Sequence, residues 1–143
     1  MVQKYLSKIS GPLLDRIDIQ IEVVPVPFKE LADASRAEHS ESIRERVVRA
    51  RDLQTERYLA LPGVYCNAQI PSKKLHDFCK INDAGMTLLK TAMERLGLSA
   101  RAYDRILKVS RTIADLDNSI DIRVEHLAEA INYRSLDKGT WGQ

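Results

Sequence analysis

The chain has 143 residues, of which 44% are hydrophobic and 6% aromatic, and its formal net charge is +2. This length suits one compact domain or two small ones, and the hydrophobic fraction excludes a chain that is disordered throughout. So small a charge does not by itself indicate nucleic-acid binding. The apolar runs are too short for a transmembrane helix, and the N-terminus lacks the layout of a signal peptide. We therefore expect a cytoplasmic protein without membrane contact, and the low aromatic fraction favours a mainly α-helical one.

Residues 17–23 alternate β-branched and polar side chains with a period of two, which predicts a β-strand. Pro25 and Pro27 end this strand. A single amphipathic strand cannot satisfy its edges or bury its apolar face, so it must pair with polypeptide outside this sequence. The pattern predicts that the chain is a piece of a larger α/β protein.

The small, polar residues 35–42 mark the best boundary in the chain. We expect residues 1–39 to belong to the α/β core and its flexible link, residues 40–136 to form a helical domain, and residues 137–143 to be a loose tail. Within the helical domain, the 3.6-residue apolar pattern predicts several helices. They cover residues 42–61, a short stretch from residue 71, and residues 84–96, 100–117 and 125–134.

Local signals fix the ends of these helices. Residues 42–45 have the form of a capping box, and the helix after them carries Ile43 and Val47 on its apolar face. Asp83 can cap the helix over residues 84–96, which we expect to bury Met86 and Leu89. Gly97 suits the left-handed end of that helix, and the Ser99 hydroxyl can cap the next one.

The helix over residues 100–117 has one apolar face, and Arg101, Arg105 and Lys108 stack on the opposite side. Such a row is usually a solvated face, which is our interpretation of Lys108. Arg101 differs because it lies in the first helical turn, where the backbone already favours negative charge and a guanidinium can share a phosphate with it. Arg111 lies at the edge of the apolar face, so a buried ion pair, packing of its stem and a ligand contact all remain open.

Two motifs carry a resemblance to a known family. The stretch Ser99-Ala-Arg-Ala-Tyr-Asp-Arg-Ile-Leu-Lys-Val-Ser110, with residues 122–134, resembles the C-terminal end of the magnesium-chelatase-like AAA+ ATPases, and the YifB/ComM branch matches best. This resemblance implies a helical-bundle lid subdomain preceded by one β-strand of a truncated α/β ATPase core. It implies that Arg101 is the sensor-2 arginine that contacts an ATP phosphate, with Arg105 as a further candidate.

The second motif, Ser10-Gly-Pro-Leu-Leu-Asp-Arg-Ile-Asp18, resembles the arginine-finger motif of magnesium-chelatase and minichromosome-maintenance ATPases. The resemblance implies that Arg16 is a catalytic residue that acts in trans on the ATP of the neighbouring subunit, where its planar charge neutralises the transferred phosphoryl group. The residues alone leave another interpretation open, an ion pair of Arg16 with Asp15 or Asp18.

An ATPase also needs parts that this sequence lacks. It contains no Gly-x-x-x-x-Gly-Lys-Ser/Thr loop and no apolar strand that ends in acidic residues to hold magnesium. We therefore expect ATP and Mg²⁺ to be used by the full-length parent, with neither bound by this fragment alone. The expected partners are the rest of the AAA+ core, identical subunits in a hexameric ring, and DNA. Cys66 and Cys79 are expected to be free thiols, and no metal-ligand spacing occurs.

An interpretation from a different class remains open. The chain can instead be a stand-alone helical DNA-binding or protein-interaction module whose recognition face is made by Arg101, Arg105 and Lys108. The small net charge and the single strand argue against it. Nucleotide-independent DNA binding that falls steeply with salt would favour it.

Overall fold

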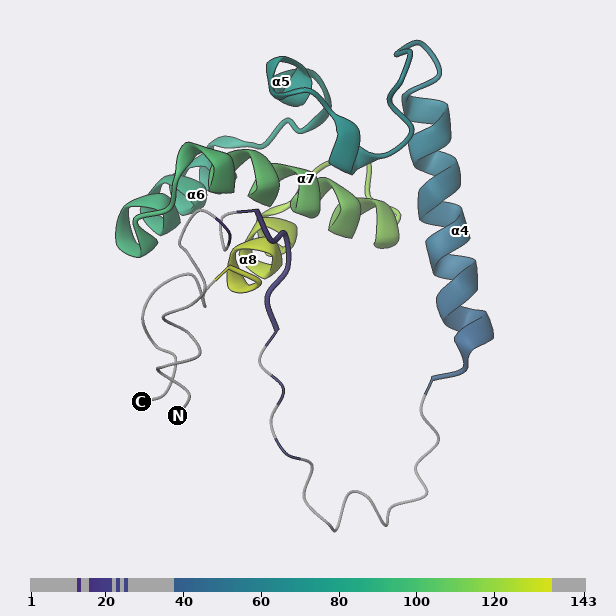
Figure 1. Ribbon diagram of the computed structural model, residues 1–143, viewed down its shortest axis with the longest axis horizontal. Helices are drawn as coiled ribbons and strands as arrows, with labels where there is room; N and C mark the ends of the chain where they lie inside the picture. The colour runs from purple at the N-terminus through teal and green to yellow at the C-terminus, as the bar shows by residue number, and fades with distance from the viewer. Residues whose placement is uncertain (1–12, 14–15, 22, 24, 26–37, 135–143) are drawn as a thin grey trace.

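The computed structural model describes residues 13, 16–21, 23, 25 and 38–134 (Figure 1). Within these residues the structure is mainly α-helical, which confirms the mainly α part of the predicted fold class. The β-strand predicted over residues 17–23 is not formed at residues 17–21, where the chain is irregular. In Figure 1, the helix labelled α7 runs through the centre of the molecule, and the helix labelled α4 lies beside the C-terminal end of α7. The helices are α4 (Ser40–Arg57), α5 (Leu75–Phe78), α6 (Asp83–Leu96), α7 (Ala100–Leu116) and α8 (Val124–Asn132), with two short 3-10 turns, η1 (Asn67–Gln69) and η2 (Ser72–Lys74).

The core is shared by α6, α7, α8 and the segment that connects α4 to α6, and within it α8 packs against both α7 and α6. Ile106 and Leu107 of α7, Leu89 of α6 and Leu127 of α8 are at most 1% exposed. Full burial of one such side chain contributes about 1.5–3 kcal/mol to folding, so this cluster is the main apolar source of stability. Ile70, Leu75 and Cys79 of the connecting segment close the same core.

The junction between α6 and α7 follows the local signals. Gly97 ends α6 with φ of 51°, in the left-handed region, and the Ser99 hydroxyl accepts a hydrogen bond from the N–H of Ala102 at 3.2 Å. Both predictions are confirmed. The cap of α6 is Asn82, one residue before the predicted Asp83, and its side chain accepts a hydrogen bond from the N–H of Gly85 at 2.8 Å.

The prediction that Met86 is buried is wrong, because its side chain is 45% exposed. The buried face of α6 is instead formed by Gly85, Leu89 and Ala92. At Gly85 the helix approaches α8 so closely that an added Cβ would lie 2.7 Å from the Cδ1 atom of Leu127. In the first turn of α6, the residue buried against α8 is therefore Gly85 and not Met86.

The helix α4 differs from its prediction at both ends. It begins at Ser40 with His39 at the N-cap, before the predicted capping box, and it ends at Arg57 rather than near residue 61. Its buried residues are Ala50 and Gln54, whereas Ile43 and Val47 are 43% and 46% exposed. Only the C-terminal half of α4 therefore packs against the bundle. Ile43 and Val47 share a face of the helix with Ala50 and Gln54, as predicted, but lie beyond the part of that face that the bundle covers.

Residues 16–21 lie against α7 and α8 in an irregular conformation. We call them the docked segment. They belong to the region predicted as a strand, and no sheet partner is present among the described residues. The boundary near residue 39 stays a prediction, and the predicted tail, residues 137–143, lies outside the described residues. Among the helices that the structure describes, none has the length and apolarity needed to cross a bilayer.

The two thiols differ in their surroundings. Cys79 is 3% exposed, whereas Cys66 is partly exposed, and burial raises the pKa of the Cys79 thiol to about 11. Because the thiolate is the reactive form, we expect Cys79 at pH 8 to react with a maleimide about 100-fold or more slowly than Cys66. Labelling rates of the Cys66→Ser and Cys79→Ser variants measure each thiol separately. Equal rates in the folded chain would contradict the expectation, and denaturing urea should make the rates similar.

Candidate functional site

Arg101 lies in the first turn of α7, directly after the cap formed by Ser99. Its side chain is exposed, and it forms no ion pair with any residue that the structure describes. The first turn of α7 contains no acidic residue, so nothing in it opposes the partial positive charge of the helix N-terminus. A free guanidinium beside unsatisfied backbone N–H groups is a suitable arrangement for a phosphate.

The other residues of the predicted basic row are engaged within the chain. Arg105 donates a hydrogen bond from Nη1 to Oδ1 of Asp18, with side chains that are 37% and 43% exposed. Lys108 donates to the carbonyl oxygen of Ala68 at 3.0 Å. In the described part of the chain, Arg101 is thus the member of the row that is left for an external anion.

Arg16 is exposed at the start of the docked segment. Its backbone N–H donates to the carbonyl oxygen of Leu13 at 3.0 Å, which closes a turn. One of the two proposed ion-pair partners, Asp18, is bound by Arg105, and the other, Asp15, lies outside the described residues. Within the described residues, the side chain of Arg16 therefore remains accessible to a second molecule.

A buried ionic cluster joins α4 to α7. Asp115, with a side chain that is 0% exposed, accepts hydrogen bonds from Arg57 at 2.5 and 2.7 Å and from Nε of Arg111 at 3.1 Å. The Arg111 guanidinium also donates to the carbonyl oxygens of Ser119 and Ile120 at 2.7 and 2.8 Å. Of the three possibilities left open for Arg111, the structure shows a buried ion pair, with Asp115. The hydrogen bond with Asp115 raises the pKa of Arg57, which keeps this guanidinium charged.

Asn67 completes this cluster, and no local pattern in the sequence indicates its role. Its Oδ1 accepts hydrogen bonds from Tyr58 at 2.6 Å and Arg57 at 3.0 Å, and its Nδ2 donates to Asp115 at 2.8 Å. Its backbone N–H donates to Oε1 of Gln54 at 3.0 Å. Burial raises the pKa of Tyr58 to about 12, so this phenol stays a donor at neutral pH. The cluster satisfies its own polar groups, which marks it as part of the scaffold beneath α7.

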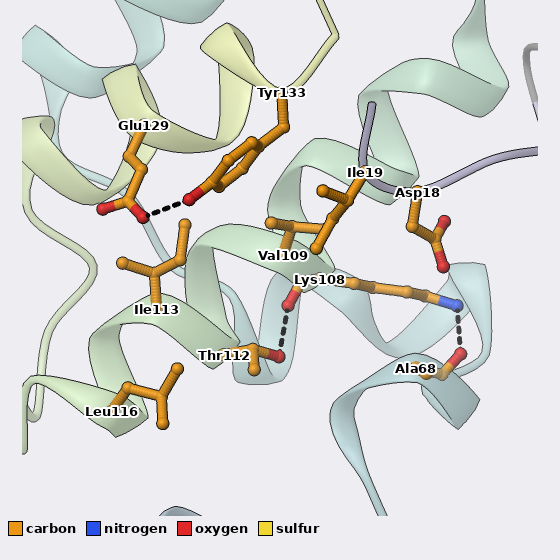
Figure 2. A pocket seen from close by; sticks show the side chains of 10 residues that line it. All are labelled: Asp18, Ile19, Ala68, Lys108, Val109, Thr112, Ile113, Leu116, Glu129 and Tyr133. Carbon is orange, nitrogen blue, oxygen red and sulfur yellow. Dashed lines mark hydrogen bonds between the residues drawn. The ribbon is translucent and has the colours of Figure 1, made fainter. Parts of the chain in front are cut away.

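A pocket of about 270 Å³ separates the docked segment from α7 and α8 (Figure 2). Ile19 faces Val109 across it, and Asp18 and Lys108 lie at one end. At the other side, the Tyr133 hydroxyl donates to Glu129 at 2.9 Å. The remaining walls are Ala68, Thr112, Ile113 and Leu116. The lining is mostly apolar, and its basic side chain, Lys108, donates to the carbonyl oxygen of Ala68.

Metal binding finds no support in the part of the chain that the structure describes. It contains no group of three or more His, Cys, Asp or Glu side chains with the geometry to hold an ion. Cys66 and Cys79 are both free thiols there.

Comparison with known proteins identifies the family. Residues 37–134 match the family model of the C-terminal part of magnesium chelatase subunit ChlI, and residues 1–31 match the model of magnesium chelatase subunit ChlI itself. Over 136 residues, or 94% of this chain, it is 45% identical to competence protein ComM of Haemophilus influenzae and 39% identical to YifB of Escherichia coli. The chain spans 26% of the length of each of these relatives. It therefore belongs to the magnesium-chelatase-like family of ComM and YifB proteins and contains the C-terminal domain of that family.

Proposed function

We propose that this chain is the lid module of a ComM/YifB-type AAA+ ATPase, in which Arg101 contacts a phosphate of ATP and Arg16 completes the ATP site of a neighbouring subunit. The observation that carries the proposal is which side chains of the basic row on α7 are paired within the chain. Arg105 and Lys108 are engaged inside the chain, whereas Arg101 is exposed at the helix N-terminus and unpaired among the described residues. This is the arrangement expected of a side chain kept for an external phosphate.

The scaffold explains how such a contact would report nucleotide state. Arg101 and the buried Ile106 lie on the same helix, which packs against α4 and α8. A phosphate that attracts Arg101 therefore moves the helix and its partners together, rather than a single loop. The family supports ATP and Mg²⁺ as the groups used by the full-length protein. Bound Mg²⁺ would neutralise charge on the phosphates, while Arg101 would orient them from the lid side.

The test is the Arg101→Ala variant of the full-length protein. Loss of a hydrogen bond to a charged phosphate weakens ATP binding and turnover by about 10- to 100-fold, because such bonds contribute about 1.5–3 kcal/mol. Thermal unfolding should be unchanged, since the side chain is exposed. ATP affinity from equilibrium titration and steady-state hydrolysis are the two measurements. The control is Lys90→Ala, because Lys90 is an exposed basic residue of α6. Equal ATP affinity and equal hydrolysis rates of the two variants would refute the role of Arg101.

The partners are part of the same proposal. We propose that the full-length protein contains the rest of the AAA+ core, assembles with identical subunits in a hexameric ring and acts on DNA. These three points rest on the resemblance of the two motifs to the family's arginine-finger and sensor-2 motifs. The competing function is a stand-alone DNA-binding module. DNA binding by this chain that is indifferent to nucleotide and is lost in the Arg101→Ala/Arg105→Ala variant would favour that alternative.

A further inference from the structure

The docked segment is held to the helical bundle through its backbone. Arg134, which follows α8 and is 1% exposed, donates a hydrogen bond from Nη1 to the carbonyl oxygen of Ile17 at 2.7 Å. The N–H of Gln20 donates to the carbonyl oxygen of Tyr133 at 2.9 Å. A charge-assisted hydrogen bond is among the strong kinds. The docked segment has no helix or strand of its own in the described residues. Its position is therefore set by the residues after α8.

A side-chain contact adds a link to α7. Arg105 pairs with Asp18, and the two residues are 87 positions apart in the sequence. Arg105 lies one helical turn after Arg101, and Asp18 lies two residues after Arg16. One ion pair thus joins the helix of the predicted phosphate contact to the segment of the predicted arginine finger.

We propose that Arg105 and Arg134 are positioning residues that fix the orientation of the docked segment relative to α7 and α8, so that movement of the lid moves Arg16. This inference rests on the proposed function and deepens it. It gives Arg105 a partner other than nucleotide, namely Asp18, and it gives Arg134 a role that its place at the end of the helical domain did not suggest.

The geometry separates the two roles. The Arg134 side chain is buried and holds the backbone at Ile17, whereas the side chains of Arg105 and Asp18 are partly exposed and set the direction of the segment. When α7 tilts, the docked segment either follows or loses these contacts. The nucleotide state sensed at Arg101 is then coupled to the position of Arg16 by the free energy of the contacts.

The amide of Gln20 reports this docking directly, and it can be measured in the chain of 143 residues. We expect Asp18→Ala to raise its hydrogen-exchange rate by about two- to fivefold, as for a partly exposed ion pair. Arg134→Ala should raise it by roughly tenfold or more, because the segment loses a charge-assisted hydrogen bond from a buried side chain. The amides of Ile106 and Leu107 serve as the reference for global unfolding, and they should keep their rates in Asp18→Ala. An unchanged Gln20 rate in both variants would overturn the docking.

Steady-state kinetics of the full-length protein test the coupling. Asp18→Ala and Arg105→Ala should each lower kcat by about fivefold or more with unchanged ATP affinity, whereas Arg101→Ala lowers the affinity itself. The charge-swapped Asp18→Arg/Arg105→Asp variant restores the pair and should recover most of the lost turnover. Loss of ATP affinity in Arg105→Ala, or no rescue by the swap, would overturn the positioning role.

The outcomes also separate this inference from the proposed function. If Arg101→Ala and Arg16→Ala leave hydrolysis unchanged, the proposed function fails, whatever the exchange of Gln20. If those two variants are impaired while Asp18→Ala speeds exchange at Gln20 without lowering kcat, the docking is purely structural and only the positioning role fails.

Discussion

In the full-length protein, Arg16→Ala is expected to lower ATP turnover by about 10³-fold or more, since arginine fingers contribute about 10³–10⁵ to kcat. The structure leaves the Arg16 side chain exposed, and the acidic neighbour Asp18 is occupied by Arg105. Binding of ATP should be retained, because a finger acts on the charge of the transition state in the neighbouring subunit. Arg16→Lys should rescue little, because an ammonium cannot make the bidentate contact of a guanidinium.

Mixed rings test whether Arg16 acts in trans. Subunits with Arg16→Ala are combined with subunits whose phosphate-loop lysine is replaced, each inactive alone. At some interfaces an intact finger then meets an intact ATP site, and part of the activity should return. No recovery in mixed rings, or normal turnover by Arg16→Ala alone, would contradict the role. Native mass spectrometry confirms that the rings contain both kinds of subunit.

The largest effect on folding is expected for Asp115→Ala. Its carboxylate is fully buried and pairs with both Arg57 and Arg111, so its removal leaves two guanidiniums without their counter-ion. Breaking a buried pair from one side costs about 3–5 kcal/mol, a large part of the stability of a small domain. Urea denaturation of the chain measures the free energy of unfolding.

The matched control is Asp77→Ala. Asp77 pairs with Lys74 at 3.0 Å, but the two side chains are 56% and 44% exposed, and such pairs contribute about 0–1 kcal/mol. If Asp115→Ala costs less than about 1 kcal/mol, the cluster does not hold α4 to α7. Asp115→Asn retains an acceptor for one arginine, so its loss in free energy of unfolding should lie between those of Asp77→Ala and Asp115→Ala.

Local chemistry explains which features the sequence predicts. The cap at Ser99 and the left-handed end at Gly97 depend on neighbours within a few residues, so both are predicted correctly. Burial on α4 depends instead on how far the bundle extends along the helix. The apolar pattern places Ile43 and Val47 on one face with Ala50 and Gln54, but no described residue covers the N-terminal half of α4, and Ile43 and Val47 stay exposed.

At the candidate site, too, features that depend on neighbouring residues are predictable from the sequence, whereas contacts between distant residues are not. The position of Arg101 in the first turn of α7 follows from the sequence, because it needs only the helix boundary. The partners of Arg57 and Arg105 do not, since Asp115 and Asp18 lie 58 and 87 positions away. Nothing in a single sequence marks which distant carboxylate meets which guanidinium, and the same holds for Asn67 beneath α7.

The buried carboxylate of Asp115 has a consequence for how α4 meets α7. An apolar contact between two helices tolerates a slip of one turn, since one aliphatic side chain replaces another. Here a slip would carry Arg57 out of reach of Asp115 and break both hydrogen bonds between them, which leaves Arg111 as the ionic partner of this buried carboxylate. We therefore expect α4 to attach in a single register and to detach as a unit, so that its projecting half keeps a fixed direction relative to the bundle.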